Sequence, residues 1–140
     1  MFKATEAIYN GLKGIHDDLL IDTEEQEGQS VVILPFSVEN GPNYQILFIS
    51  TDDQNDVAVR VFGLVHVDED QKSKILPTLN DLNDEYRFVK FVCDSDGDVN
   101  VEYDITMDGT EPAEIARELL IRFTRIIDGA YPELMRALWA

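Results

Sequence analysis

The chain has 140 residues, the usual size of one domain and enough to bury a sizeable core. Eleven lysines and arginines stand against twenty-eight aspartates and glutamates, which gives a net charge of −17 at pH 7. Nucleic acids and anionic membranes bind clustered cations, so this balance argues against both as partners. The single cysteine, Cys93, cannot form an internal disulfide, and no leader or membrane-spanning stretch is evident, so we expect a cytoplasmic protein.

The first predicted elements are a helix over residues 2–20 and an acidic loop. Apolar residues recur in this helix at intervals of three and four, namely Ile8, Leu12, Ile15 and Leu19. Gly11 and Gly14 weaken the helix by roughly 1 kcal/mol each relative to alanine, or else permit close packing against a strand. The acidic stretch 22–27 predicts a solvated loop, because its like charges repel one another.

Three β-rich runs follow at residues 31–38, 44–50 and 57–67. The short polar connections between them predict an antiparallel meander. Apolar residues lie on both faces of these strands, so both faces need a cover. One cover is a layer of helices, and the second is either another helix or another protein chain. The candidate interface with such a chain consists of Val32, Leu34, Phe36, Phe62 and Leu64.

A helix and two strands are predicted next. The helix spans residues 71–86, and Pro77 either kinks it or lies in its first turn. The two strands are expected at residues 88–93 and 99–105, and the second alternates strictly between apolar and polar residues.

A long helix closes the chain. It is expected to begin with Thr110 as its N-cap and Pro112 in its first turn, while Pro132 precedes either a final helical stretch or a kinked continuation. Residues 112–140 contain four acids and four arginines and are neutral, so residues 1–111 carry the entire net charge. The elements predict one α+β domain over residues 1–140, in the order α-β-β-β-α-β-β-α, with helices packed on an antiparallel sheet.

The acidic sequence 94–98, Asp-Ser-Asp-Gly-Asp, is either a metal loop or a hairpin turn. An EF-hand needs its glycine after the third acid and helices on both sides, and neither condition holds here. A three-residue loop of Ser95, Asp96 and Gly97 pairs Phe91 with Val101, which places apolar side chains together. Such a loop needs a left-handed residue in third place, and Gly97 supplies it. We therefore predict a hairpin with this register and no metal site.

No catalytic signature is present. The chain has no nucleophile elbow and no glycine-rich phosphate loop. His16 and His66 lack metal-ligand spacing, and Cys93 is predicted on the core face of its strand. We expect no enzyme activity, no catalytic residue, no cofactor and no metal.

Residues 79–104 and the end of the last helix resemble the YbjN-domain family. Matching positions are Leu82, Asn83, Tyr86, Lys90, Phe91, Asp96, Gly97, Tyr131 and Pro132. The resemblance implies a fold similar to the type III secretion chaperones, which are small, acidic, usually dimeric α+β proteins that hold a partner chain. It also implies a role in bacterial sensory transduction, without known catalytic residues. Asn83 is expected to be buried and to tie its helix to the next strand.

Two functional hypotheses remain open. The first is a non-enzymatic binding module, chaperone-like or regulatory, that forms a homodimer and binds a client or signalling protein through an apolar strand or helix face. The alternative is a small-ligand or metal-binding domain, or an unrecognised enzyme, with a pocket between sheet and helices.

Overall fold

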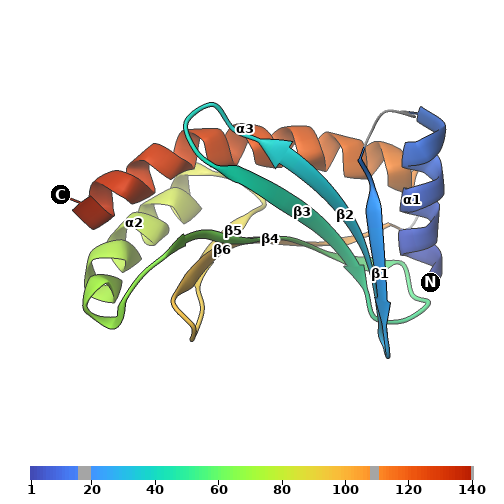
Figure 1. The fold of residues 1–140 in the computed structure, drawn as a ribbon, viewed down its shortest axis with the longest axis horizontal. Coiled ribbons are helices and arrows are strands. Elements are labelled where there is room, and N and C mark those ends of the chain that lie inside the picture. The colour runs from blue at the N-terminus through green and yellow to red at the C-terminus, as the bar shows by residue number, and fades with distance from the viewer. Residues whose placement is uncertain (16–19, 108–110, 140) are drawn as a thin grey trace.

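The computed structural model describes residues 1–15, 20–107 and 111–139, and within them three α-helices pack on one face of a six-stranded sheet (Figure 1). The elements are α1 (Lys3–Ile15), β1 (Asp22–Gln26), β2 (Gln29–Ser37), β3 (Asn43–Ser50), β4 (Asp56–His66), a 3-10 turn (Glu69–Gln71), α2 (Lys72–Glu85), β5 (Lys90–Cys93), β6 (Asp98–Thr106) and α3 (Pro112–Trp139). All neighbouring strands are antiparallel, in the order β1-β2-β3-β4-β6-β5. The predicted α+β class and the meander of the central strands are confirmed.

Strand β1 corrects the prediction of an acidic loop. Residues Asp22–Gln26 pair with β2 through Gln26 opposite Gln29, and Gly28 closes the hairpin at a φ of +79°. The strand lies at the edge of the sheet, and its residues are mostly exposed. An edge strand that stays in water needs no apolar side chains, and charges on it prevent pairing with other edges. The prediction of a loop was wrong because it considered only the repulsion between like charges and not pairing at the edge of a sheet.

Helix α1 is shorter than predicted, because Leu20 is not helical; residues 16–19, including His16 and Leu19, lie outside the described part. Gly11 does permit a close approach, but to helix α3 rather than to a strand, since a Cβ on it would collide with Ala113. A Cβ on Gly14 would meet nothing. The Thr5 hydroxyl and the Ser30 hydroxyl share a buried hydrogen bond of 2.6 Å that joins α1 to β2.

Both interior prolines are accommodated within continuous helices. Pro77 lies inside α2 and not in its first turn, because the helix begins at Lys72. Helix α3 begins at Pro112, which therefore lies in its first turn as predicted, and the helix continues through Pro132 to Trp139. The expected N-cap, Thr110, lies outside the described residues. Helix α3 runs along the length of the molecule, with α1 towards one end and α2 at the other (Figure 1).

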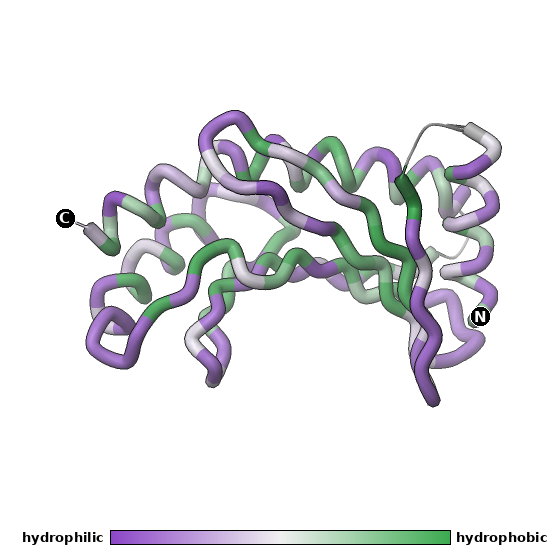
Figure 2. The backbone as a smooth tube through the Cα atoms, viewed as in Figure 1, coloured by the Kyte–Doolittle hydropathy of each residue, from purple (hydrophilic) through white to green (hydrophobic). Residues whose placement is uncertain are grey.

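The hydrophobic core lies between the helices and one face of the sheet. Its largest fully buried side chains include Phe48, Phe123, Ile8, Leu12, Leu34 and Leu134. Figure 2 shows hydrophobic residues along the central strands and hydrophilic residues at the turns. None of the helices in the described part is both long enough and apolar enough to cross a membrane.

Candidate functional site

The face of the sheet that the helices leave uncovered, called here the open face, is the candidate site. Opposed residues of an antiparallel pair share a face, so the paired row from Ile33 through Leu47, Arg60 and Glu102 to Lys90 lies on it. A second row passes through Ile49 and neighbouring residues. Leu47 and Ile49 are half-buried, whereas Ile33 is buried yet lies outside the helix-side core.

Phe62 is the most exposed large apolar side chain of this face, at 50%. It precedes Gly63, whose φ of +69° and hydrogen bond from its N–H to Asn100 Oδ1 (2.9 Å) fix a bulge in β4 between Val61 and Val65. The bulge separates two residues that an unbroken strand would place on one face. Leu64 is therefore buried at 3% exposure, while Phe62 is left in solvent.

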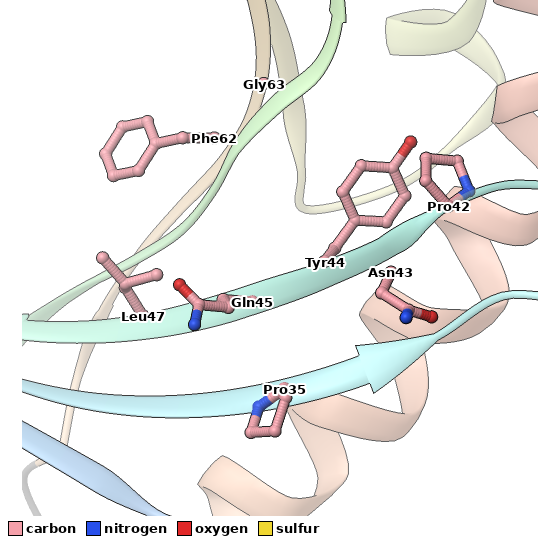
Figure 3. A pocket seen from close by; sticks show the side chains of 8 residues that line it. All are labelled: Pro35, Pro42, Asn43, Tyr44, Gln45, Leu47, Phe62 and Gly63. Atoms are coloured by element: carbon pink, nitrogen blue, oxygen red, sulfur yellow. The ribbon is translucent and has the colours of Figure 1, made fainter.

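A hollow of about 680 Å³ lies beside Phe62 and is open to solvent. In Figure 3, Phe62 and Pro35 stand on either side of Gln45 and Leu47. Among the described residues that line this hollow, none has an acidic, basic or histidine side chain. The one ionisable group among them is the phenol of Tyr44, which is buried and donates a hydrogen bond to the Leu64 carbonyl at 2.9 Å. Burial raises the pKa of Tyr44, so the phenol stays protonated at neutral pH.

Part of the open face carries charges that compensate one another. Arg60 Nη1 contacts Asp104 Oδ1 at 2.7 Å, and Arg60 Nε lies 4.0 Å from Glu102 Oε2. Lys90 Nζ lies 3.7 Å from the other oxygen of Glu102. Two cations and two carboxylates thus form a neutral network beside the apolar row. The network itself is neutral, but Asp22 and Glu24 of β1, which pair with Ile33 and Val31, place two further carboxylates on the same face.

Three of the predicted interface residues belong to the core instead. Val32, Leu34 and Leu64 are at most 3% exposed and cannot be reached by a partner in the folded chain. The other two lie on separate surfaces, Phe62 on the open face and Phe36 beside α3. Sequence reasoning missed Leu47, Ile49 and Arg60. The separation of Phe62 from Leu64 had a signal in the sequence, namely Gly63 inside the β run, because an interior glycine often marks a bulge.

The acidic loop forms the predicted hairpin. Phe91 pairs with Val101 and Cys93 with Val99, and Gly97 has a φ of +88°. One carboxylate oxygen of Asp94 accepts the N–H groups of Asp96 and Asp98, at 2.9 and 3.0 Å. The Asp94 carboxylate is therefore hydrogen-bonded to the backbone of its own loop.

The Asp94 side chain also anchors the start of β6. Its second oxygen accepts Asn100 Nδ2 at 2.9 Å, and this bond is the main cause that lowers the pKa of the Asp94 carboxyl. His66 Nδ1 lies 3.1 Å from Asp98 Oδ1 on the surface. Within the described residues no three His, Cys, Asp or Glu side chains are placed to hold a metal ion.

The family-like positions form a structural joint between α2, β5 and α3. The Asn83 amide accepts the Phe91 N–H at 2.6 Å and donates to the Phe91 carbonyl at 3.2 Å, which ties α2 to β5 as expected. Asn83 is exposed, however, so the expectation that it is buried was wrong. Leu82 and Phe91 are buried, and the rings of Tyr86 and Phe91 are 6.1 Å apart.

Cys93 lies on the core face of the edge strand β5, as predicted, and is partly buried against the core. Desolvation raises the pKa of its thiol, which disfavours the reactive thiolate. The described residues therefore offer no activated thiol at this position.

Comparison with protein families gives one match that covers most of the chain. Residues 12–136 match the YbjN family, described as "Putative bacterial sensory transduction regulator". The chain belongs to the YbjN family. The match includes the joint around Asn83 and the Asp96–Gly97 turn, as the resemblance in the sequence indicated. A search of curated protein sequences finds no significant match.

Proposed function

We propose that this YbjN-family protein is a non-enzymatic regulator that acts by binding other protein chains, in a chaperone-like manner, through the open face of its sheet. The observation that carries the proposal is Phe62, half-exposed on a face that no described helix covers, with Leu47 lining the same hollow. Exposed apolar side chains grouped on one surface are typical of protein interaction sites. The description of the family as a regulator agrees with this role.

The proposal includes self-association as a homodimer. Without another partner, a second copy covers the open face and removes Phe62 from water. The neutral network of Arg60, Lys90, Glu102 and Asp104 supports contact at this part of the face, because its cations and carboxylates compensate one another. We also propose the cytoplasm as the compartment, on the cysteine usage of the sequence.

Binding fits the hollow beside Phe62 better than catalysis does. Acid–base or nucleophilic catalysis needs a titratable or nucleophilic group within reach of a substrate. The residues that line the hollow provide only the phenol of Tyr44, which is already bonded to Leu64.

Co-purification from the cell that makes this protein tests the proposal. The full chain is tagged and compared with Phe62→Ser and with Leu76→Ser, since Leu76 is 55% exposed on α2 and provides a matched loss of apolar surface elsewhere. We expect wild type and Leu76→Ser to retain the same partner protein, identified by mass, and Phe62→Ser to lose it. Equal recovery with Phe62→Ser contradicts a binding site on the open face.

A further inference from the structure

A second hollow lies on the open face, beside Ile49. It has a volume of about 470 Å³, is open to solvent, and is formed by the end of β3, the start of β4 and the end of β6. Ile49 is two positions from Leu47 on β3, and Leu47 lines the uncharged hollow beside Phe62. Residues two apart on a strand share a face, so the two hollows are neighbours on one surface.

The carboxylates of the hollow beside Ile49 outnumber its cations. Among the described residues that line it, the charged ones are Asp56, Arg60 and Asp104. Arg60 Nη1 contacts Asp104 Oδ1 at 2.7 Å, so these two charges compensate each other. Asp56 is exposed and forms no ion pair with any residue that the structure describes. A cation brought to Asp56 therefore gains a partner without breaking an existing ion pair.

The β1 side of the open face adds to this excess of negative charge. Asp22 and Glu24 lie on the face, and within the described part of the chain neither forms an ion pair. Arg60 and Lys90, by contrast, are both held by carboxylates of their own chain. The exposed apolar side chains of the face are thus bordered by carboxylates that the chain itself does not neutralise.

Other occupants match this face less well than a basic one. A second copy brings the same excess of carboxylates, and its own Arg60 and Lys90 are already paired. An acidic segment would place further negative charge beside Asp56. An uncharged apolar segment would remove water from the carboxylates without giving them a partner, which costs free energy.

The distance along β4 sets the length of the occupant. Phe62 and Asp56 are six positions apart on this strand, which corresponds to roughly 20 Å at about 3.3 Å per residue. A helix covers this distance in about 13 residues, because each residue advances it by about 1.5 Å. A segment of three to four helical turns therefore reaches from one hollow to the other.

We propose that the open face binds a basic amphipathic segment of a partner protein, whose apolar side chains cover Phe62 and Leu47 and whose lysine or arginine pairs with Asp56. This inference deepens the proposed function and rests on it, because it names the chemistry of the segment that the same face binds. The net charge of −17 attracts such a segment from a distance. A second copy covers the same side chains, so the segment and the homodimer exclude each other.

Fluorescence anisotropy with labelled probe peptides tests the proposal. The main probe is an amphipathic helical peptide with leucines in its first half and two lysines on the same face in its second half. One comparison peptide has glutamates in place of the lysines, and another has serines in place of the leucines. These comparisons use the unaltered protein, so they do not depend on the folding of a variant.

Two matched pairs of variants locate the binding site of the lysine peptide. Asp56→Lys is compared with Asp84→Lys, which changes the net charge equally at an exposed position of α2. Phe62→Ser is compared with Leu76→Ser, which also removes an exposed apolar side chain from α2.

We expect wild type to bind the lysine peptide and to bind each comparison peptide at least about tenfold more weakly. Asp56→Lys should weaken binding of the lysine peptide by about fivefold or more, and Asp84→Lys by less than about twofold. Phe62→Ser should weaken it by about tenfold, while Leu76→Ser should leave it unchanged. Equal losses in Asp56→Lys and Asp84→Lys, equal affinity for the lysine and glutamate peptides, or no binding to wild type overturn the proposal.

Salt separates this proposal from the homodimer. Binding of the lysine peptide should weaken between about 0.01 M and 0.15 M ionic strength, because opposite charges are screened, whereas the dimer should strengthen. A dimer that depends on Phe62, together with no binding of the lysine peptide, overturns this inference and leaves the proposed function intact. Equal peptide binding by wild type and Phe62→Ser contradicts both.

Discussion

The hairpins at the two edges of the sheet differ in how their glycines are surrounded. Gly28 in the β1–β2 turn and Gly97 in the β5–β6 turn have similar φ angles, +79° and +88°. A Cβ on Gly28 would meet nothing within 4 Å, whereas one on Gly97 would collide with the backbone carbonyl of Val67. The Gly97 carbonyl also accepts the Val67 N–H at 2.8 Å. One turn therefore stands in solvent, and the other is part of the packed structure.

The two edge strands are also protected by different means. On β5, the outward N–H and carbonyl of Phe91 are both bonded to the Asn83 side chain, which takes the place of a neighbouring strand. On β1, charged side chains disfavour pairing with another strand, since the residues from Asp22 to Glu27 include four acids. Neither edge invites another strand, so the open face between them is the part of the sheet that remains available to another chain.

The largest difference between the two hairpins is expected when each of the two glycines is replaced by alanine. Gly97→Ala should lower the free energy of unfolding by about 3 kcal/mol, because it combines left-handed strain with a backbone collision. Gly28→Ala should cost about 1 kcal/mol, from strain alone. Urea unfolding of both variants measures the difference. Equal losses would show that the packing of Gly97 against Val67 contributes nothing.

Replacing the Asn83 side chain should have an intermediate effect. Asn83→Ala removes two hydrogen bonds and exposes the β5 edge, which should cost about 2 kcal/mol. Asn80→Ala is the control, because Asn80 is exposed on the same helix and alanine favours a helix. Hydrogen exchange at the Phe91 amide should accelerate in Asn83→Ala only. Similar urea midpoints and unchanged exchange would contradict the edge-sealing role.

The smallest effect on stability is expected from lowering the pH, through the Asp94 carboxyl. Hydrogen bonds from Asn100 and from backbone N–H groups lower the pKa of Asp94 in the folded state, so the ionised carboxylate stabilises the β5–β6 loop. That contribution is complete above the unfolded pKa of about 4 and is lost as the pH falls through the lower folded pKa. Unfolding followed from pH 6 downward should therefore show a shallower acid dependence in Asp94→Asn than in wild type. Identical slopes would remove this role of Asp94.

The two hairpins also differ in how far their structure could be predicted from the sequence. The β5–β6 register followed from local information, since the alternation around Phe91 and the glycine at position 97 agree on one loop length. Strand β1 could not be recognised from its own residues, because what makes it a strand is hydrogen bonding to β2 at an exposed edge.

The candidate site was only partly predictable, for a related reason. Phe62 was identified from its apolar character, but its separation from Leu64 depends on the bulge at Gly63 and on Asn100 from a distant strand. Which sheet face the helices cover depends on contacts far apart in sequence, such as Gly11 against Ala113.

The most direct test of the central claim, that chains meet on the open face, is the mass in solution measured by light scattering behind a sizing column. Wild type, Phe62→Ser and Leu76→Ser are compared at about 0.01 M and 0.15 M ionic strength, where the Debye length falls from about 30 Å to 8 Å. Two copies together carry twice the net charge of −17, so screening should favour association. We predict a dimer for wild type and Leu76→Ser that strengthens with salt, and a monomer for Phe62→Ser. A monomeric wild type at high salt and high protein concentration, or an undiminished dimer of Phe62→Ser, would contradict the account.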